Sequence, residues 1–193
     1  MAENLLQVDE QARIQPWLAE SVVRTAPTVW TATLRPGIRF TDGRPVTPDD
    51  VIATFRRITD PKDPKSGASG LTMLRAVTAV GDDKVRFTLN EASPVFPQYL
   101  AEYTAGIVPA DFDVKRPVGT GAFKYSSFTP GQQSVFERNE YYWRPEQPYV
   151  DRLELIDFSE DDARINALLS SQVDAIDQVP LALTEVMAAY DTV

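Results

Sequence analysis

Residues Pro117–Trp143 read PVGTGAFKYSSFTPGQQSVFERNEYYW, and the organisation of the whole chain can be inferred outward from this run. It starts with a glycine-rich bend and ends with a cluster of aromatic residues. Between them lie two segments, Ala122–Phe128 and Gln133–Arg138, whose polar and apolar residues alternate as in a β-strand. Because Pro130-Gly131 is a turn dipeptide, we expect the two segments to form a hairpin.

Nothing in this run is arranged for catalysis, and we interpret it as scaffold. Gly119 and Gly121 permit a positive φ or a close approach between chain segments. We expect Arg138 and Asn139 to donate hydrogen bonds to backbone carbonyl groups at the end of the hairpin. The aromatic residues 141–143 are expected to cover its base.

The remaining elements follow from periodicity and from turn and capping residues. Strands are predicted over Ser21–Arg24, Thr28–Leu34, Arg75–Val80, Lys84–Leu89, Arg152–Phe158 and Val173–Gln178. Helical structure is predicted at the start of Asn4–Leu18, from Thr47 to about Asp60, at Leu71–Leu74 and Phe96–Tyr103, over 160–171 behind a Ser159 cap, and from Pro180 onward. This mixed order predicts an α+β protein with mixed, mostly antiparallel sheets and flanking helices.

Composition excludes several classes of function. The 193 residues carry a formal net charge of −9, which argues against a nucleic-acid partner, because such a protein needs a basic patch. The chain has no cysteine and no histidine, so disulfides, thiolate metal sites and Ser-His-Asp or Cys-His catalysis are impossible within it. No apolar run is long enough to insert into a membrane. We therefore predict no catalytic residues, no metal site and no cofactor.

Acidic pairs leave one enzymatic alternative, a glycosidase, because two carboxylates can act as acid and base. The candidates are Asp49-Asp50 and Glu160-Asp161-Asp162. Both groups fall in the first turn of a predicted helix, where acidic side chains complement the helix dipole. We therefore interpret them as structural.

Several motifs in collinear order resemble the family 5 extracytoplasmic solute-binding proteins, the peptide, nickel and sugar receptors of ABC importers. The opening run matches the family pattern PVGTGPY/F-K followed by R-N-x-x-YW, with Ala122 where proline is usual. Pro16–Ser21 is similar to P-x-LAES, and Leu34–Val51 to LRPGVKFHDGTPLTAEDV, with Thr41 in place of a frequent histidine. Lys84–Leu89 and residues 163–177 match two further patterns of the family.

The resemblance implies a two-lobed, type II periplasmic-binding-protein-like fold, of which this chain is expected to supply part of the first lobe. Residues 21–115 would form an inserted subdomain, residues 116–193 part of the main first-lobe sheet, and residues 1–20 its lead-in. The missing second lobe would belong to the same protein. The chain is expected to start after a signal segment, so the full-length protein would be extracytoplasmic and lipid-anchored.

The resemblance implies that the protein captures a solute between two lobes and delivers it to ABC permease subunits. The expected solute is an oligopeptide. The family consists of receptors and not enzymes. The resemblance places possible ligand contacts in the loop Ser66–Leu71 and the segment Tyr103–Ile107. The individual candidates within them are Ser69, Leu71, Tyr103, Thr104 and Gly106.

A second interpretation, from another class, is the ligand-sensing domain of a transcription regulator, in which a similar module follows a DNA-binding domain. Residues upstream of this chain would separate the two: a lipoprotein signal indicates the receptor, and a helix-turn-helix indicates the regulator.

Overall fold

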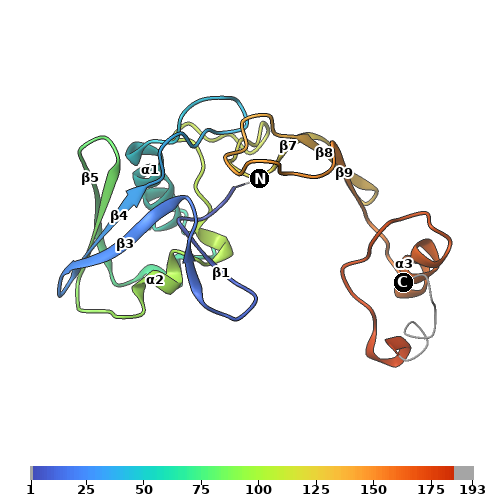
Figure 1. The fold of residues 1–193 in the computed structure, drawn as a ribbon. Helices are drawn as coiled ribbons and strands as arrows, with labels where there is room; N and C mark the ends of the chain where they lie inside the picture. The colour runs from blue at the N-terminus through green and yellow to red at the C-terminus, as the bar shows by residue number, and fades with distance from the viewer. Residues whose placement is uncertain (1, 185–193) are drawn as a thin grey trace. The chain divides into compact units, whose positions relative to one another are not determined.

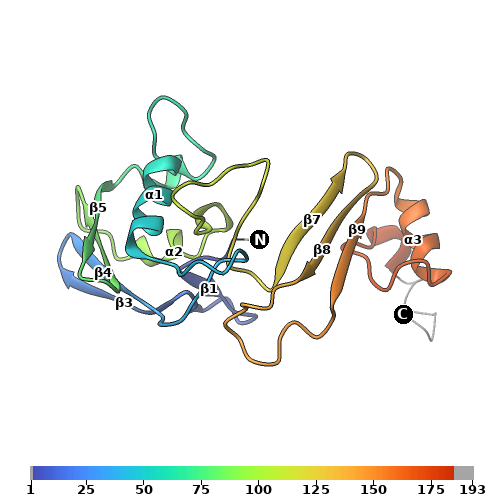
Figure 2. The same cartoon turned by 90° about the horizontal axis from the view of Figure 1, so that it is seen from above.

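The computed structural model describes residues 2–184 and divides the chain into two compact units. The first comprises Met1–Tyr125 and Phe136–Leu153, and the second comprises Ser126–Val135 and Glu154–Val193. Figures 1 and 2 show helices and strands mixed along the chain. The α+β class expected from the sequence is confirmed.

A four-stranded sheet forms the centre of the first unit. Its strands are β3 (Ala19–Ala26), β4 (Val29–Leu34), β6 (Lys84–Leu89) and β5 (Leu74–Val80), in that order across the sheet. All three pairings are antiparallel, as predicted. The long helix α1 (Pro48–Ile58) lies across one face (Figure 2).

The hydrophobic core lies between this sheet and α1. Apolar and polar residues alternate along the strands, so the apolar side chains of one face lie toward this core. Val85, Phe87 and Leu89 of β6 are at most 2% exposed, as the period-two pattern predicted. Phe87 packs edge to face against Phe55 of α1, with ring centroids 5.1 Å apart. It also contacts Phe96 at 5.4 Å. Three aromatic rings from separate elements therefore fix the helix on the sheet.

The start of α1 is set by the sequence Thr47-Pro48-Asp49-Asp50. The carboxylate of Asp50 accepts hydrogen bonds from the backbone N–H of Thr47 at 2.9 Å and from its hydroxyl at 2.7 Å. The other carboxylate oxygen accepts the backbone N–H of Ala110 at 3.0 Å. One buried acid thus caps the helix and attaches a distant loop to it.

The N-terminal region differs from the prediction, because residues 4–18 contain no helix. Two short strands, β1 (Leu6–Val8) and β2 (Ile14–Pro16), form an antiparallel pair there. Asp9 closes the turn between them: one carboxylate oxygen accepts the backbone N–H groups of Gln11 and Arg13 at 3.0 and 2.8 Å. The hydrogen bonds between Asp9 and the backbone stabilise a turn here in place of the expected helix.

A third sheet contains β7 (Phe123–Thr129), β8 (Gln133–Arg138) and β9 (Arg152–Ile156), in that order. The predicted hairpin is therefore confirmed, with Gly131 at a positive φ of 67° in its turn. Asn139 is buried and donates to the carbonyl of Gly121 at 2.9 Å, as expected. Arg138 also donates to a backbone carbonyl, through its own N–H to the carbonyl of Asp151 at 2.8 Å, while its side chain donates to the Asp151 carboxylate.

Helix boundaries were predicted less well than strands. The helix expected over Phe96–Tyr103 is only α2 (Phe96–Tyr99), followed by the 3-10 turn η2 (Tyr103–Ala105). The turn expected at Leu71–Leu74 lies earlier, as η1 (Ala68–Leu71), because Leu74 already belongs to β5.

The C-terminal part of the chain also departs from expectation. Helix α3 spans Asp161–Leu169, and its N-cap is Glu160, not Ser159. The strand predicted over Val173–Gln178 is absent from the described residues. Ser171 adopts a positive φ of 57°, and the backbone N–H of Gln172 donates to the carbonyl of Ala167. These residues therefore form the C-terminal cap of α3 and not the start of a strand.

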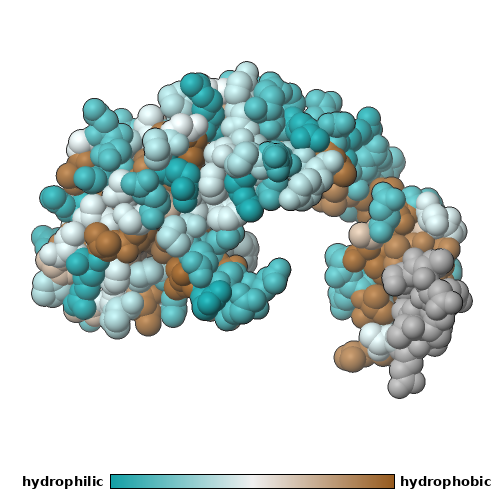
Figure 3. Space-filling model, in the orientation of Figure 1, coloured by the Kyte–Doolittle hydropathy of each residue, from teal (hydrophilic) through white to brown (hydrophobic). Residues whose placement is uncertain are grey.

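The helix predicted from Pro180 is described only as the 3-10 turn η3 (Leu181–Leu183). Its expected buried residues Val186, Met187 and Tyr190 lie outside the described residues. The second unit exposes apolar surface, seen as brown in Figure 3, to which Ile156 and Leu181 contribute with 39% and 92% of their side chains exposed.

The cap of α1 gives a first prediction. Asp50→Ala should lower the free energy of unfolding by about 2 kcal/mol, because it removes a helix cap and leaves the N–H of Ala110 without its acceptor. Thermal denaturation measures the effect. Asp49→Ala is the matched control: Asp49 is exposed in the same first turn, so it should cost well under half as much. Equal losses in the two variants would contradict the assigned role of Asp50.

Candidate functional site

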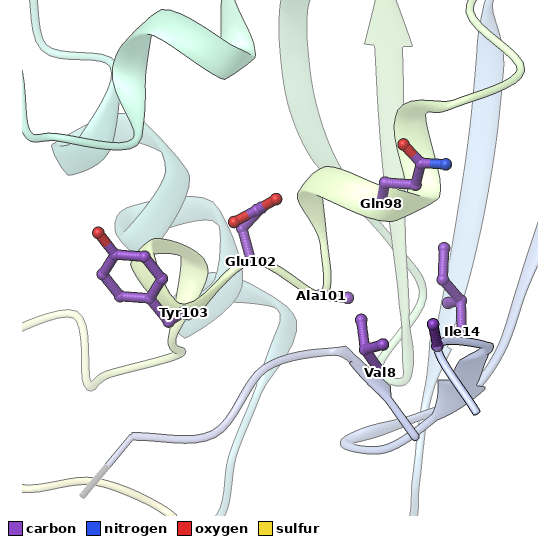
Figure 4. A pocket seen from close by; sticks show the side chains of 7 residues that line it. Val8, Ile14, Gln98, Ala101, Glu102 and Tyr103 are labelled. Carbon is purple, nitrogen blue, oxygen red and sulfur yellow. The ribbon is translucent and has the colours of Figure 1, made fainter. Parts of the chain in front are cut away.

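A cavity of about 520 Å³, open to solvent, lies in the first unit (Figure 4). Its volume lies in the range of small-molecule and peptide side-chain sites. Two parts of the chain form its walls, the β1–β2 hairpin and the segment from α2 to η2. The lining residues are Val8, Ala12, Ile14, Gln98, Ala101, Glu102 and Tyr103.

The hairpin wall is held in place by Asp9. Besides the two backbone groups of the turn, its carboxylate accepts the Arg13 side chain at 3.0 Å and Gln15 at 2.9 Å. The backbone hydrogen bond from Arg13, together with these contacts, holds the pKa of Asp9 below its ordinary value. Ala12 adopts a positive φ of 59° in the turn. This closed network presents Val8 and Ile14 to the cavity.

The opposite wall is tied to the hairpin through the backbone. The N–H of Leu6 donates to the carbonyl of Leu100 at 3.3 Å, and the side chain of Asn4 donates to the carbonyl of Glu102. Directly after these anchored residues comes Tyr103, whose side chain is 88% exposed. A large aromatic ring is therefore presented to solvent from a fixed stretch of backbone, which is the arrangement of a stacking platform.

The two segments predicted to contact a ligand lie against each other in the structure. A methyl group added at Gly67 would lie 2.6 Å from the hydroxyl oxygen of Thr104, and one at Gly70 would lie 2.8 Å from the ring of Tyr99. Only glycine allows so close an approach. The loop Ser66–Leu71 thus packs closely against the segment that carries Tyr103.

The five candidate residues differ in their positions. Tyr103 lines the cavity, and Ser69 is exposed on its loop. Leu71 is 3% exposed and belongs to the hydrophobic core, while Thr104 and Gly106 are half-buried beside Gly67 and Ala2. Contact between these residues and a ligand stays a prediction.

Elsewhere in the first unit, the carboxylate of Glu3 accepts three hydrogen bonds from aromatic side chains. One oxygen accepts the indole N–H of Trp17 at 2.8 Å and the hydroxyl of Tyr142 at 3.0 Å. The other accepts the indole N–H of Trp143 at 3.1 Å. Hydrogen bonds to a charged acceptor are stronger than neutral ones, so this group joins two segments far apart in sequence.

The backbone of Glu3 adds two further connections. Its N–H donates to the hydroxyl of Thr120 at 3.1 Å, and its carbonyl accepts the N–H of Ile107 at 2.8 Å. The second contact fixes the end of the segment 103–107. Through Thr120, the buried glycine-rich bend is joined to Glu3. The carbonyl of Gly119 in this bend accepts the N–H of Thr41 at 2.7 Å.

Two arginine side chains pack against the aromatic cluster around Glu3. Trp17 and Trp143 pack edge to face with ring centroids 5.1 Å apart. The guanidinium of Arg35 lies over Trp143, and that of Arg144 lies over Trp17, each 4.9 Å from the ring. These contacts add cation–π attraction and place positive charge beside the Glu3 carboxylate.

A smaller hollow of about 260 Å³ lies between the turn at Asp42 and residues 109–118. Its charges are mutually paired: Arg44 contacts Asp42 and Asp111, and Arg116 contacts Asp113. Hydrogen bonds from Arg44 to the two carboxylates, first of all Asp42, raise the pKa of Arg44. With its charges satisfied, this hollow offers less to a ligand than the first.

The acidic pairs considered as catalytic candidates are structural. Asp49 and Asp50 occupy the first turn of α1, and Asp161 and Asp162 that of α3, as predicted. Within residues 2–184, no group of three or more acidic side chains is placed to hold a metal ion. No described helix has both the length and the apolar character needed to cross a lipid bilayer.

Comparison with protein families gives a match over residues 13–192 to the bacterial extracellular solute-binding proteins, family 5. The chain belongs to this family. The resemblance noted from the sequence motifs is therefore confirmed.

Among curated family 5 relatives, Protein XP55 of Streptomyces lividans is 31% identical over 183 residues, which cover 89% of this chain and 33% of XP55. The oligopeptide-binding protein AppA of Bacillus subtilis is 31% identical over 163 residues, covering 76% of this chain and 30% of AppA. The chain thus spans about a third of the length of these relatives.

Solved structures confirm the fold. The binding protein AgaA of A. tumefaciens R10, in complex with agropinic acid, superposes with a TM-score of 0.93 at 31% identity, covering 99% of this chain and 40% of AgaA. AppA of Bacillus subtilis with a nonapeptide gives a TM-score of 0.88 at 24% identity, with the same coverages. The chain therefore has the predicted fold, as part of a type II periplasmic binding protein.

Sequence reasoning missed the two features that build the site. The β1–β2 wall was hidden by the expectation of a helix, although Asp9 followed by Gln11 and Arg13 is a turn signal. The role of Glu3 could not be inferred, because its partners Trp17 and Trp143 are distant in sequence and reveal nothing about a shared acceptor.

The Glu3 cluster gives a second prediction. Glu3→Gln should lower the free energy of unfolding by about 2 kcal/mol, because an amide NH₂ replaces one carboxylate oxygen and faces an N–H donor. Thermal denaturation followed by tryptophan fluorescence measures the loss. Glu20→Gln, at an exposed glutamate of the same unit, is the charge-matched control and should leave the melting temperature unchanged. A Glu3→Gln variant as stable as the parent would show that the cluster does not hold the unit together.

Tyr142 gives a third prediction, on pH. Burial, and then the negative charge of Glu3, raise the pKa of Tyr142 above its ordinary value. The unfolded chain ionises first as the pH rises past about 10, so the stabilisation by Tyr142 is complete below that pH and is lost above it. The stability gap between the parent and Tyr142→Phe should therefore narrow in alkaline solution.

Urea denaturation at a series of pH values measures that gap. Tyr141→Phe is the matched control, since the neighbouring ring is 41% exposed, and its stability should run parallel to the parent at every pH. A gap for Tyr142→Phe that stays constant with pH would contradict the prediction.

Proposed function

We propose that this chain supplies one lobe of a two-lobed extracytoplasmic receptor, which captures an oligopeptide and delivers it to the permease of an ABC importer. The observation that carries the proposal is the cavity between the β1–β2 hairpin and the α2–η2 segment, with the Tyr103 ring 88% exposed beside it. An anchored, exposed aromatic ring next to an apolar hollow is suited to binding and offers no chemistry of bond cleavage.

The relatives support a receptor and leave the solute open. AppA of Bacillus subtilis is named an oligopeptide-binding protein, AgaA was solved with agropinic acid, and a relative 28% identical is the nickel-binding periplasmic protein of Escherichia coli. We choose an oligopeptide because the cavity lining is mainly apolar with a few polar groups, which suits a side chain. In the described part of the chain no acidic cluster is placed for a metal ion.

The rest of the proposal concerns organisation. We assign residues 21–115 to an inserted subdomain and residues 116–193 to part of the main sheet of the same lobe, with residues 1–20 as its lead-in. The solute would be trapped when a second lobe closes over this one by a hinge motion. The full-length receptor would be anchored by lipid at the outer face of the cell membrane.

A fourth prediction tests the site. Tyr103→Ala in the full-length protein should weaken binding of oligopeptides about tenfold, because it removes an exposed aromatic contact of the cavity. Calorimetric titration with alanine oligopeptides measures the affinity. Tyr149→Ala is the matched control, since that tyrosine is 83% exposed and lies outside the cavity lining, and it should bind as the parent does.

The same titration includes agropinic acid and the nickel–histidine complex. Tighter binding of either than of every oligopeptide would overturn the proposed solute class. Peptide binding that is unchanged in Tyr103→Ala would overturn the proposed site and leave the receptor function standing.

A further inference from the structure

We propose that the cavity beside Tyr103 accepts an alkyl cation, an ammonium or guanidinium group on an aliphatic chain, such as the lysine or arginine side chain of a peptide. This inference rests on the proposed function and specifies the chemistry of the same site. Three features carry it: an unpaired carboxylate, an apolar floor and an exposed aromatic ring, all within one hollow (Figure 4).

The charge of the lining is one-sided. Among the residues that line the cavity, Glu102 is acidic and none is basic. In the part of the chain that the structure describes, the ion pairs do not include Glu102, and only its backbone carbonyl is engaged by a neighbour, through the Asn4 side chain and the N–H of Ala105. The carboxylate is therefore available to a cation from solution.

The nearest arginine on the hairpin wall is already occupied. Arg13 is bound to Asp9 at 3.0 Å and also donates to Gln11 at 3.1 Å, so its charge is compensated locally. Arg13 thus does not neutralise Glu102. An anionic group entering the cavity would meet the unpaired carboxylate and be repelled, whereas a cation would be attracted.

The floor suits the aliphatic part of such a ligand. Val8, Ile14 and Ala101 give apolar surface, and Val8 is 55% exposed in the absence of a ligand. Lysine and arginine bury their methylene chains on surfaces of this kind and keep the charged end at the polar edge. In Figure 4, Glu102 is drawn between Tyr103 on one side and Val8 and Ile14 on the other.

The remaining lining residues add attraction of the same sign. The face of the Tyr103 ring attracts a cation by its quadrupole. The Gln98 side chain, exposed on α2, contributes an amide oxygen that can accept a hydrogen bond from an N–H of the ligand. The backbone that carries the ring is anchored, because Ala105 is buried and the N–H of Ile107 is bonded to the carbonyl of Glu3.

The test is calorimetric titration of the full-length protein with a matched set of peptides. Tetra-alanine is substituted at one position at a time with lysine, norleucine or glutamate, and cadaverine serves as a free alkyl cation. At one position, the lysine peptide should bind about fivefold tighter than the norleucine peptide, and the glutamate peptide more weakly than both. High salt should reduce the advantage of lysine.

The variant Glu102→Gln should remove the advantage of the lysine peptide over the norleucine peptide. Glu91→Gln, at an exposed glutamate outside the lining, is the control with the same change of charge and should keep the preference. Because Glu102 is exposed, neither substitution is expected to disturb folding, and unchanged thermal denaturation checks this.

The outcomes separate this inference from the proposed function. Peptides that bind without any preference for lysine, or a preference that persists in Glu102→Gln, would overturn the inference and leave the receptor for oligopeptides standing. Binding of cadaverine that depends on Glu102, with no peptide bound, would support the cation site and overturn the peptide as solute. Binding of neither peptides nor cadaverine would overturn both.

Discussion

The first unit depends on one carboxylate. Glu3 accepts hydrogen bonds from Trp17, Tyr142 and Trp143, and its own backbone bonds Thr120 and Ile107. An anion enclosed by aromatic rings is favourable only when its acceptors are filled, and here three donors and two neighbouring guanidinium groups meet that need. The donors depend on the carboxylate in turn, because the half-buried indole and phenol groups would lose these hydrogen bonds if it were absent. Residues that are more than a hundred positions apart are therefore constrained to one geometry.

That constraint explains how the chain can present an exposed aromatic ring at a fixed place. Tyr103 makes few contacts through its own side chain, since it is 88% exposed. Its position is determined by its backbone neighbours: the carbonyl of Glu102 is bonded by Asn4 and Ala105, and the N–H of Ile107 is bonded by Glu3. The tight approaches at Gly67 and Gly70 then fix the adjoining loop to the same support. The backbone that carries Tyr103 is therefore fixed before a ligand binds, so no backbone ordering has to be added to the cost of binding.

The strands of this fold could be predicted from the sequence because their pattern is local. Val85, Phe87 and Leu89 alternate with polar residues, and Pro130-Gly131 marks a turn, so β6 and the β7–β8 hairpin are specified by neighbouring residues alone. The α1 cap was predictable for the same reason, since Thr47 and Asp50 are three positions apart. The missed features are decided at longer range or by competition. The hairpin of β1 and β2 replaces a helix because Asp9 captures two backbone N–H groups, and the strand expected at Val173–Gln178 is lost because Ser171 turns the chain back toward α3.

The candidate site also combines a residue that could be named from the sequence with a wall that could not. This difference bears on how one fold can bind different solutes. Tyr103 was named from a motif, whereas the apolar wall of Val8 and Ile14 became visible only once the hairpin was placed. In the run Pro117–Trp143, Asn139, Tyr142 and Trp143 belong to the family pattern. Their side chains form hydrogen bonds within the protein, to Gly121 and Glu3. Substitution of the residues that donate hydrogen bonds to Glu3 should therefore lower stability. Glu102 and Gln98 are exposed and lie outside the hydrophobic core, so their substitution should cost little. In the proposed receptor, the scaffold and the ligand contacts are thus carried by separate residues, so the cavity lining could change with the solute while the Glu3 cluster keeps the frame in place.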